Sequence, residues 1–433
     1  MKRLLVISFY YPPIMSAGSV RIGKLVKYLP EYGWEPIVLT VAPKPNIAQG
    51  IPNEADETRI VRTRYRDPVG LFSRPPSVHG CEPSSVSGPK SSKGSTLVFL
   101  REWIKKVSPF TIQRMPDRML GWYPYAIQAG KRVMEWDSID AIFSSHPSPV
   151  SHLIAAKLSR EFRVPWVADY RDLWTGSTLR PYPKWLEALE SKYERKILKN
   201  AAFLTTVSET LKGYLENLHA KSVEIIYNGF DPEDFEKEAA RGKPGVFTLV
   251  YSGTLYTSRQ SPVPLFEALR HLMEEGIVTK DKFQVRFIGV QEPPFRELVD
   301  TYGLDDLVSS EPFQPYKENV ATLKGAGALL FFSWNEGEME GNPTSKIFQY
   351  VGAGRPILVV GGGNRFAVDF IERTGTGKVG RDSKEIRYII SRWLEAVSRD
   401  GRIPYLPNRE VIKPYNRRVQ AGQLAAVLGR VTS

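Results

Sequence analysis

The chain has 433 residues, of which 42% are hydrophobic and 24% charged, values that exclude a wholly disordered protein. Lys and Arg total 59 against 47 Asp and Glu, and the net charge of +12 favours an anionic partner: a phosphorylated ligand, an acidic membrane or nucleic acid. A solubility bias without a partner is the alternative. Cys81 is the only cysteine, which excludes an intramolecular disulfide and a cysteine-based zinc site.

The apolar runs are too short to cross a membrane. Residues 4–9 are apolar but stop before Pro12-Pro13, and the run is shorter than the core of a signal peptide. Residues 328–332 and 356–360 have the length of strands, well below the roughly 18 to 20 residues of a spanning helix. We therefore expect a cytoplasmic protein with at most peripheral membrane contact.

The first forty residues predict a β-α-β unit. Residues 4–9 are continuously apolar, as in a parallel strand that is covered on both faces. Apolar residues at helical spacing follow over residues 20–29, and residues 37–41 predict the next strand. This order is typical of the opening of a doubly wound α/β fold.

The same alternation continues along most of the chain. Residues 73–95 are dense in Ser, Pro and Gly and predict a mobile surface insert. Further elements of the first half are strands at 141–143, 166–168, 203–207 and 223–226 and helices at 151–158, 185–202 and 209–218. The charged stretch 233–244 predicts a linker. Elements of the second half are strands at 247–251, 285–288, 328–332 and 357–360 and helices at 264–275, 294–302 and 345–352.

The pattern predicts two Rossmann-like domains, residues 1–235 and 245–405. A basic helical segment, residues 406–433, follows and is expected to pack back on the first domain. Ligands of parallel α/β sheets bind at the carboxyl ends of the strands. We therefore expect the site in a cleft between the two domains.

Common cofactor motifs are absent from the sequence. No G-x-G-x-x-G follows the first strand, and residues 375–379 lack the spacing of a P-loop. No Asp-x-Asp triplet is present to hold a metal on a nucleotide diphosphate, and the five histidines show no two-histidine metal spacing. We therefore expect no metal and no bound cofactor.

Two segments of the first half carry candidate chemistry. Ser16 and Gly18 lie in a strand-to-helix turn, where backbone N–H groups and a helix N-terminus favour an anion. A simple tight turn is the alternative. Asp169-Tyr170-Arg171-Asp172-Leu173-Trp174 follows an apolar strand and places two carboxylates and a guanidinium at its end. The alternative is an ion pair between Asp169 and Arg171 that locks a turn.

Two further segments lie in the second half. Tyr251-Ser252-Gly253-Thr254-Leu255 follows a strand, and Gly253 permits the close approach of a phosphate that Arg259 would neutralise. A turn glycine and a solvated arginine are the alternative. Residues 341–357 open a helix with Thr344 and Ser345, whose free N–H groups together with Lys346 would bind a diphosphate. The alternative is an ordinary helix cap.

Together these segments resemble a known family. Tyr-Tyr-Pro-Pro…Gly-Ser-x-Arg, Asp-Tyr-Arg-Asp-Leu-Trp, Tyr-Ser-Gly-Thr-Leu and Pro-Thr-Ser-Lys-Ile-Phe-Gln-Tyr…Gly-Arg-Pro-Ile are similar to motifs of the GT-B glycosyltransferases of family four, the retaining group 1 type. The resemblance covers nearly the whole chain. It implies two Rossmann-like domains facing across a cleft, the second holding a nucleotide-diphosphate sugar and the first an acceptor. It also implies metal-independent transfer to an acceptor hydroxyl in polysaccharide or glycoconjugate biosynthesis.

The resemblance also implies roles for individual residues. His146, in Ser144-Ser145-His146-Pro147, lies near the place of the family's active-site histidine, although a loop histidine is the alternative. The expected catalytic residues are His146, Asp169, Arg171 and Asp172. The expected donor-binding residues are Gly18, Gly253, Thr254, Arg259, Thr344, Ser345, Lys346 and Gln349.

The chain departs from the family pattern at three positions. Gln349 stands where the family usually has a glutamate that holds the ribose, and Gln offers hydrogen bonds without charge. Gly341 stands where another acid is common, a role that Glu338 or Glu340 could take. Thr254 replaces a frequent arginine, which leaves Arg259 as the main cation of that loop. These departures bear on the identity of the donor and on activity.

Other functions are compatible with the same patterns. A nucleotide-sugar epimerase or a phosphorylase can share the fold, and a non-catalytic regulatory subunit would explain Gln349 and Thr254. A nucleic-acid binder is suggested by charge alone. Residues 97–122 mix aromatic with basic side chains and predict contact with an anionic membrane and a lipid-linked acceptor, unless their apolar face packs on its own domain.

Overall fold

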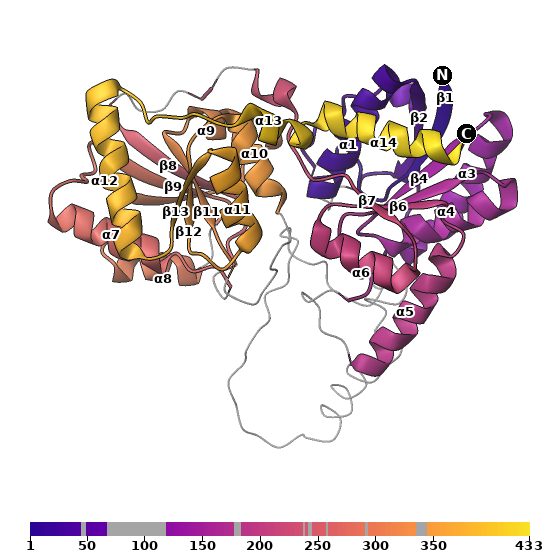
Figure 1. Cartoon of the computed structure of the whole chain (residues 1–433), viewed down its shortest axis with the longest axis horizontal. Coiled ribbons are helices and arrows are strands. Elements are labelled where there is room, and N and C mark those ends of the chain that lie inside the picture. The colour runs from indigo at the N-terminus through magenta and orange to yellow at the C-terminus, as the bar shows by residue number, and fades with distance from the viewer. Residues whose placement is uncertain are drawn as a thin grey trace. The chain divides into compact units, whose positions relative to one another are not determined.

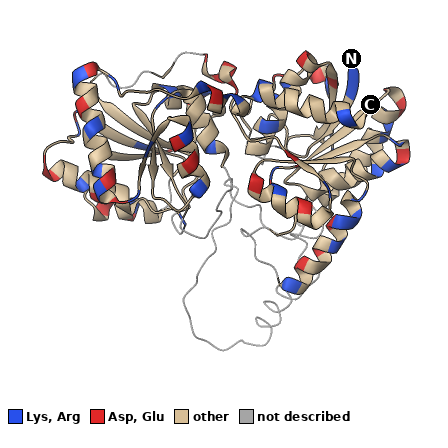
Figure 2. Ribbon diagram, in the orientation of Figure 1, with Lys and Arg blue, Asp and Glu red and all other residues tan. Residues whose placement is uncertain are grey.

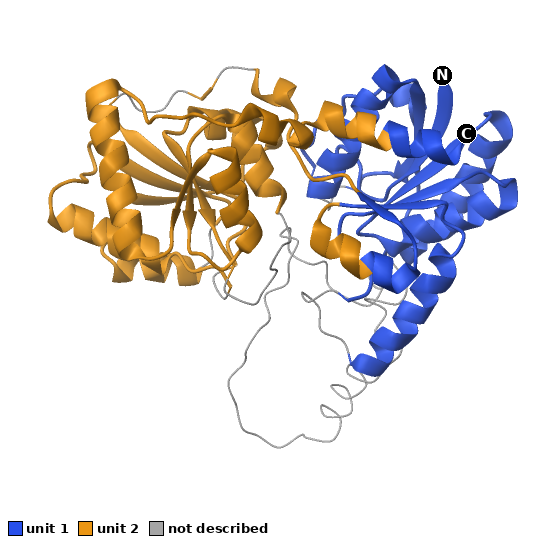
Figure 3. Ribbon diagram, in the orientation of Figure 1, with its two compact units in different colours: residues 1–206, 215–224, 425–433 blue, residues 207–214, 225–424 orange. Residues whose placement is uncertain are grey.

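The computed structural model describes residues 1–44, 49–66, 118–176, 183–236, 239–240, 245–256, 259–290, 293–334 and 344–433. The predicted insert 73–95 lies outside this description, as do residues 97–117 of the amphipathic segment and residues 335–343, which include Glu338, Glu340 and Gly341. The described chain divides into two compact units (Figure 3). Unit 1 comprises residues 1–206, 215–224 and 425–433, and unit 2 comprises residues 207–214 and 225–424.

Unit 1 is built on a seven-stranded sheet of order β3-β2-β1-β4-β5-β6-β7. Strands β1, β2, β4, β6 and β7 of this sheet are labelled in Figure 1. The pairings from β3 to β6 are parallel. The strands are β1 (Lys2–Ile7), β2 (Trp34–Val41), β3 (Ile60–Thr63), β4 (Ala141–His146), β5 (Trp166–Tyr170), β6 (Phe203–Thr206) and β7 (Val223–Ile225). Its helices include α1 (Ala17–Tyr28), α3 (Tyr123–Trp136), α4 (Pro149–Phe162) and α5 (Lys184–Leu198). Helix α6 (Glu209–His219) is shared between the two units.

Unit 2 is built on a six-stranded parallel sheet of order β10-β9-β8-β11-β12-β13. The strands are β8 (Phe247–Ser252), β9 (Phe283–Ile288), β10 (Val308–Glu311), β11 (Ala328–Phe332), β12 (Ile357–Val360) and β13 (Gly377–Gly380). Its helices are α7 (Val263–Glu274), α8 (Pro293–Thr301), α9 (Tyr316–Gly325), α10 (Ser345–Ala353), α11 (Arg365–Thr374), α12 (Ser383–Asp400) and α13 (Arg409–Ile412).

Alternate residues of β8 enter two different apolar clusters. Leu249 and Tyr251 pack in one cluster, whereas Val250 packs in the other. Side chains of a strand point alternately to its two faces, so the unit 2 sheet has a core on each side. This explains the continuous apolar runs, because a parallel sheet that is covered on both faces needs no polar side.

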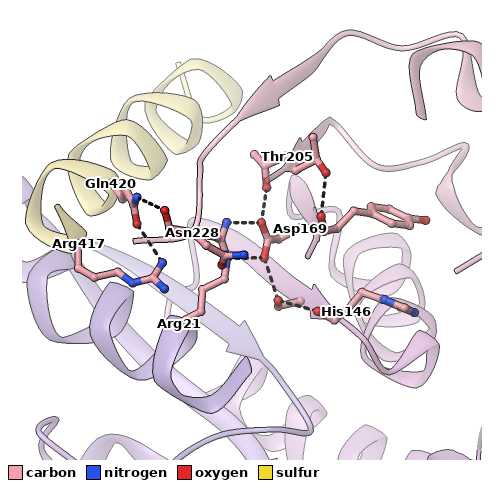
Figure 4. A network of polar contacts seen from close by, with 10 residues as sticks. Arg21, His146, Asp169, Thr205, Asn228, Arg417 and Gln420 are labelled. Carbon is pink, nitrogen blue, oxygen red and sulfur yellow. Dashed lines mark hydrogen bonds and ion pairs between the residues drawn. The ribbon is translucent and has the colours of Figure 1, made fainter. Parts of the chain in front are cut away.

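Helix α14 (Arg417–Val431) is shared between the two units. In unit 2 its buried Arg417 donates to Gln420 Oε1 at 2.9 Å, and Gln420 Nε2 donates to the carbonyl of Asn228 at 3.2 Å (Figure 4). Residues 425–433 belong to unit 1, where Lys2 Nζ donates to Thr432 Oγ1 at 2.8 Å. The domain limits expected from the sequence, 1–235, 245–405 and 406–433, stay a prediction.

The described helices include none that is both long enough and apolar enough to span a bilayer. At the end of the predicted amphipathic segment, Arg118–Trp122 forms a 3-10 turn. Trp122 in this turn is fully buried, and its indole N–H donates to Thr63 Oγ1 at 2.7 Å. The sequence left open whether this segment contacts a membrane or packs on its own domain. Trp122 packs inside its own unit.

Candidate functional site

In unit 1, Gly18 lies in the first turn of α1, beside Arg171. Ser16 caps the helix, and its Oγ accepts the N–H of Gly18 at 3.1 Å. A Cβ on Gly18 would come 3.0 Å from Arg171 Nη1, so the missing side chain gives the guanidinium access to the helix start. Nη1 is buried and has no hydrogen-bond partner among the described residues. A free donor beside the positive end of a helix is an arrangement that suits an anion.

Asp169 forms a fully buried ion pair with Arg21, from α1. Both side chains have no exposed surface, and Arg21 Nη2 and Nε donate to Oδ1 and Oδ2 of Asp169 at 2.9 and 3.2 Å. Ser145 Oγ and Thr205 Oγ1 donate to the same carboxylate at 2.8 and 2.9 Å, as Figure 4 shows for Thr205. Four donors therefore satisfy the charge, and they tie β5 to α1, β4 and β6.

The expected alternative for this motif, an ion pair between Asp169 and Arg171, is wrong. Arg171 donates instead to Oδ2 of its neighbour Asp172, at 2.6 Å from Nη2 and 3.0 Å from Nε. Strand β5 ends at Tyr170, so Asp169 lies within the sheet whereas Arg171 and Asp172 lie beyond the strand end. Asp172 is the most accessible of the three, with 44% of its side chain exposed. Asp169, in contrast, has no exposed surface.

His146 ends β4 and is nearly buried, with 5% of its surface exposed. Its ring stacks on Tyr170 at a centroid distance of 5.9 Å, and Nδ1 has no hydrogen-bond partner among the described residues. Burial lowers the pKa of His146 to about 4, against the opposing effect of the carboxylates of Asp172 and Glu194. The imidazole is therefore neutral at pH 7 and able to accept a proton.

Two further histidines pack around the same tyrosine. The rings of His152 and His219 lie 4.9 and 6.1 Å from that of Tyr170. His152 Nδ1 shares a hydrogen bond of 2.7 Å with Ser144 Oγ, and burial holds its pKa well below the usual value. The Tyr170 hydroxyl donates to Glu194 at 2.7 Å. This cluster could not be predicted from the sequence, because its members are separated by up to 73 residues, from His146 to His219.

In unit 2, Gly253 follows β8 and contacts Lys346. The backbone of Gly253 has φ of 108°, a value that favours glycine, and its N–H donates to the carbonyl of Ile288 at 2.9 Å. A Cβ at this position would lie 3.2 Å from Cε and 3.3 Å from Nζ of Lys346. The structure thus brings together two residues, 93 apart in sequence, that were predicted to bind the same diphosphate.

Lys346 is held against the aromatic ring of Tyr251. Its Nζ donates to the Tyr251 hydroxyl at 2.6 Å and lies 3.8 Å from the ring centre. The hydroxyl in turn donates to the carbonyl of Thr254 at 2.7 Å. Burial lowers the pKa of Lys346 to about 7. Tyr251 is thus in contact with a predicted site residue, a contact that the sequence did not predict.

Lys346 is the second residue of α10, whose N-terminus carries no side-chain cap. Thr344 is the N-cap residue, but its Oγ1 is buried and bonds to no described residue. The first N–H groups of a helix have no partner within the helix. Ser345, Lys346 and Gln349 are all partly buried. The start of α10 therefore offers unsatisfied donors beside a lysine.

Arg259 and Thr254 flank this site. Thr254 is exposed, and Arg259 is partly buried with its guanidinium carbon 5.8 Å from the centre of the Trp334 ring. Trp334 follows β11, which pairs with β8, so Arg259 lies near the carboxyl edge of the sheet that also carries Gly253. The Trp334 indole N–H is buried and finds no acceptor among the described residues.

The middle of the sequence matches one protein family. Residues 87–234 match the family described as Glycosyltransferase Family 4. Over these residues the chain is similar to Glycosyltransferase Family 4. The expected family resemblance is thereby confirmed. WcaL of Salmonella typhimurium, which is named as a colanic acid biosynthesis glycosyltransferase, is 23% identical over 168 residues, which cover 38% of this chain and 40% of that protein. The match thus spans less than half of the relative's length.

Solved structures share the fold across the whole chain. A sucrose-phosphate synthase from Thermosynechococcus elongatus superposes with a TM-score of 0.58 at 15% identity, covering 99% of each chain. HepE from Anabaena, solved with UDP and glucose, gives a TM-score of 0.51 at 12% identity, covering 100% of this chain and 97% of that one. Two parallel sheets with these neighbours identify the GT-B fold, which confirms the fold class expected from the sequence.

Proposed function

We propose that the protein transfers a sugar from a nucleotide-diphosphate sugar to an acceptor hydroxyl in the biosynthesis of a polysaccharide or glycoconjugate. The observation that carries the proposal is the placement of Lys346 at the uncapped start of α10, against Gly253. WcaL is named for the synthesis of such a polysaccharide, and HepE was solved with UDP and glucose, which agree with this substrate class.

The donor diphosphate is proposed to bind at the start of α10. The N–H groups of the first turn, the hydroxyl of Thr344 and the ammonium of Lys346 are all donors that suit phosphate oxygens. Gly253 lets the diphosphate approach the backbone. Gln349, one turn further along α10, offers its neutral amide to a ribose hydroxyl.

The chemistry follows from where charge develops. The bond between the anomeric carbon and the diphosphate oxygen breaks, and the acceptor oxygen forms the new bond to that carbon. The proton of the acceptor hydroxyl passes to an oxygen of the departing diphosphate. Negative charge builds on the departing diphosphate, where Lys346 and the helix N–H groups stabilise it. Arg259 adds a second cation at the same edge of the sheet. We propose that these groups serve in place of a metal and that the anomeric configuration is retained.

Unit 1 is proposed to hold the acceptor. Arg171 and the start of α1 offer donors to an anionic group of either substrate, and neutral His146 can take up a proton. Asp169 and Arg21 would act by fixing the strand ends on which His146 and Arg171 lie. Double substitution Arg21→Met with Asp169→Leu separates these roles, because it removes the charges of the pair without leaving either one buried alone.

The test begins with ligand binding. At a fixed concentration, a bound donor raises the melting temperature more the tighter it binds, so UDP, GDP, ADP and TDP and their sugars should be screened by thermal shift. The expected result is stabilisation of the wild type by one nucleotide series and loss of this effect in Lys346→Ala. Equal stabilisation of both proteins would overturn the assignment of Lys346.

A second candidate, a non-catalytic nucleotide-binding subunit, is favoured by exposed Thr254 and neutral Gln349 at positions where the family usually has charged residues. Binding without consumption of the donor, in the presence of a bacterial acceptor fraction, would favour this role. An epimerase would instead change the donor when no acceptor is present. Transfer of label to the acceptor, abolished in Lys346→Ala, would establish the transferase.

A further inference from the structure

Helix α5 presents an exposed apolar ridge. Trp185 and Leu189 are 54% and 55% exposed, and Tyr193 is 37% exposed. Their spacing of four residues places them along one side of the helix. Tyr193 rests edge-on against buried Trp174 at 6.0 Å, which anchors one end of the ridge. Three large apolar side chains in a row exceed the scattered exposure of an ordinary surface.

Basic side chains fill the rest of the exposed face. The exposed cations of α5 and its C-cap are Lys184, Lys192, Arg195, Lys196 and Lys199. None of them forms an ion pair with a described residue. Figure 2 shows Lys and Arg along the helix. The exposed charges of this face are therefore positive, and Lys192 and Lys196 lie beside the apolar ridge.

The acidic side chains of α5 point to the opposite side. Glu190 and Glu194 are 2% and 0% exposed, and only Glu187 is partly accessible. Glu194 accepts the N–H of Thr175 at 3.1 Å and the hydroxyl of Tyr170 at 2.7 Å. These bonds fix the rotation of the helix about its axis. The basic side chains and the exposed parts of Trp185 and Leu189 therefore point away from the core of unit 1.

We infer that this face of α5 docks on an anionic lipid bilayer. Trp and Tyr favour the headgroup region, Leu adds apolar area, and long lysine side chains reach anionic headgroups while their stems cover apolar surface. Single-stranded nucleic acid also attracts aromatic and basic residues, but it binds along grooves and stacks its bases on aromatic rings. On α5 the three side chains lie along one helix, with Leu189 between Trp185 and Tyr193, and this arrangement favours the bilayer. This inference does not depend on the proposed transfer reaction.

The test uses the full chain and vesicle flotation. Vesicles of phosphatidylcholine with about 30 mol% phosphatidylglycerol should bind the protein, and pure phosphatidylcholine should not. Lys192→Glu with Lys196→Glu should reduce binding at least about tenfold. Lys378→Glu with Lys384→Glu, at two exposed positions of unit 2, changes the net charge equally and should leave binding unchanged.

A second pair of variants tests the apolar ridge. Trp185→Ala should lower binding several-fold. Trp136 is the last residue of α3 and is 80% exposed, and Trp136→Ala should leave binding unchanged. Both residues are exposed, so melting temperatures should stay at the wild-type value. Equal loss in the two lysine pairs or the two tryptophan variants would overturn the inference. Binding to a single-stranded oligonucleotide but not to the anionic vesicles would overturn it as well.

Discussion

The ammonium group of Lys346 lies 3.8 Å from the centre of the Tyr251 ring and 2.6 Å from its hydroxyl oxygen. Burial there lowers the pKa of the lysine to about 7, so the amine is largely neutral at pH 8. A diphosphate at the start of α10 would favour the charged form. Binding of the donor and protonation of Lys346 should therefore be coupled.

Nucleotide binding is expected to take up protons. At pH 8 the wild type should gain close to one proton per bound nucleoside diphosphate, because the free amine is mostly neutral and the bound one is charged. Calorimetry in buffers of different ionisation enthalpy measures this number. The uptake should disappear in Lys346→Met. Substitution Gln349→Ala, on the same helix, should weaken binding but keep the uptake; if it also abolishes uptake, another group carries the proton.

Gly253→Ala is expected to weaken donor binding. The positive φ of 108° makes alanine strained by roughly 1 kcal/mol, and the added Cβ would press on Lys346 at 3.2 Å. Gly276, with φ of 72° and open space around its Cβ position, is the matched control. Both alanine variants should lose similar stability in urea, while only Gly253→Ala raises the Kd for the nucleotide, by about tenfold. A normal Kd in Gly253→Ala would contradict the proposed site.

Asp169→Asn is expected to be far more harmful to stability than Asp172→Asn. Removing one charge of a buried ion pair leaves Arg21 uncompensated, which costs about 3 to 5 kcal/mol. Asp172 is 44% exposed, and its pair with Arg171 contributes at most about 1 kcal/mol. Urea unfolding followed by tryptophan fluorescence compares the two. Similar losses would mean that the buried pair does not hold the strand ends together.

Mild acid is expected to destabilise unit 1. The folded chain resists protonating His146 and His152, whereas the unfolded chain binds protons there below about pH 6.5. The free energy of unfolding should therefore fall as the pH drops from about 6.5 toward 4, with His146 accounting for on the order of 3 kcal/mol. Urea midpoints across this range should fall less steeply in His146→Gln. Exposed His271→Gln serves as the control, and an equal change in both variants would argue against the cluster.

The sequence predicted the two α/β halves and most buried strands, because continuous apolar runs mark parallel strands that are covered on both faces. It missed β13 (Gly377–Gly380), whose two glycines and lysine carry no apolar signal, and β10 (Val308–Glu311), which is polar at the edge of its sheet. Helices α3 and α12 were not predicted either.

The candidate site was predicted only in part. The contact of Gly253 with Lys346 agrees with the expectation that both face one ligand, because a glycine after a strand and a helix start share the carboxyl edge of the sheet. The partner of Asp169 could not be foreseen, since Arg21 lies 148 residues away and Arg171 only two. Spacing along the chain says little about which charges meet inside a sheet.

The four donors around Asp169 also constrain how such a chain can diverge. A carboxylate that bonds Arg21, Ser145 and Thr205 cannot be lost alone, because each remaining polar group would be stranded without water. Natural variants that lack the acid should therefore also lack the arginine and carry small apolar residues in place of the hydroxyls. Arg171 and Asp172 lie beyond the strand end and are not part of this group. The residues that follow β5 can therefore change in evolution, and substrate preference with them. The group of Asp169 and its three partners is instead expected to be conserved or replaced as a whole.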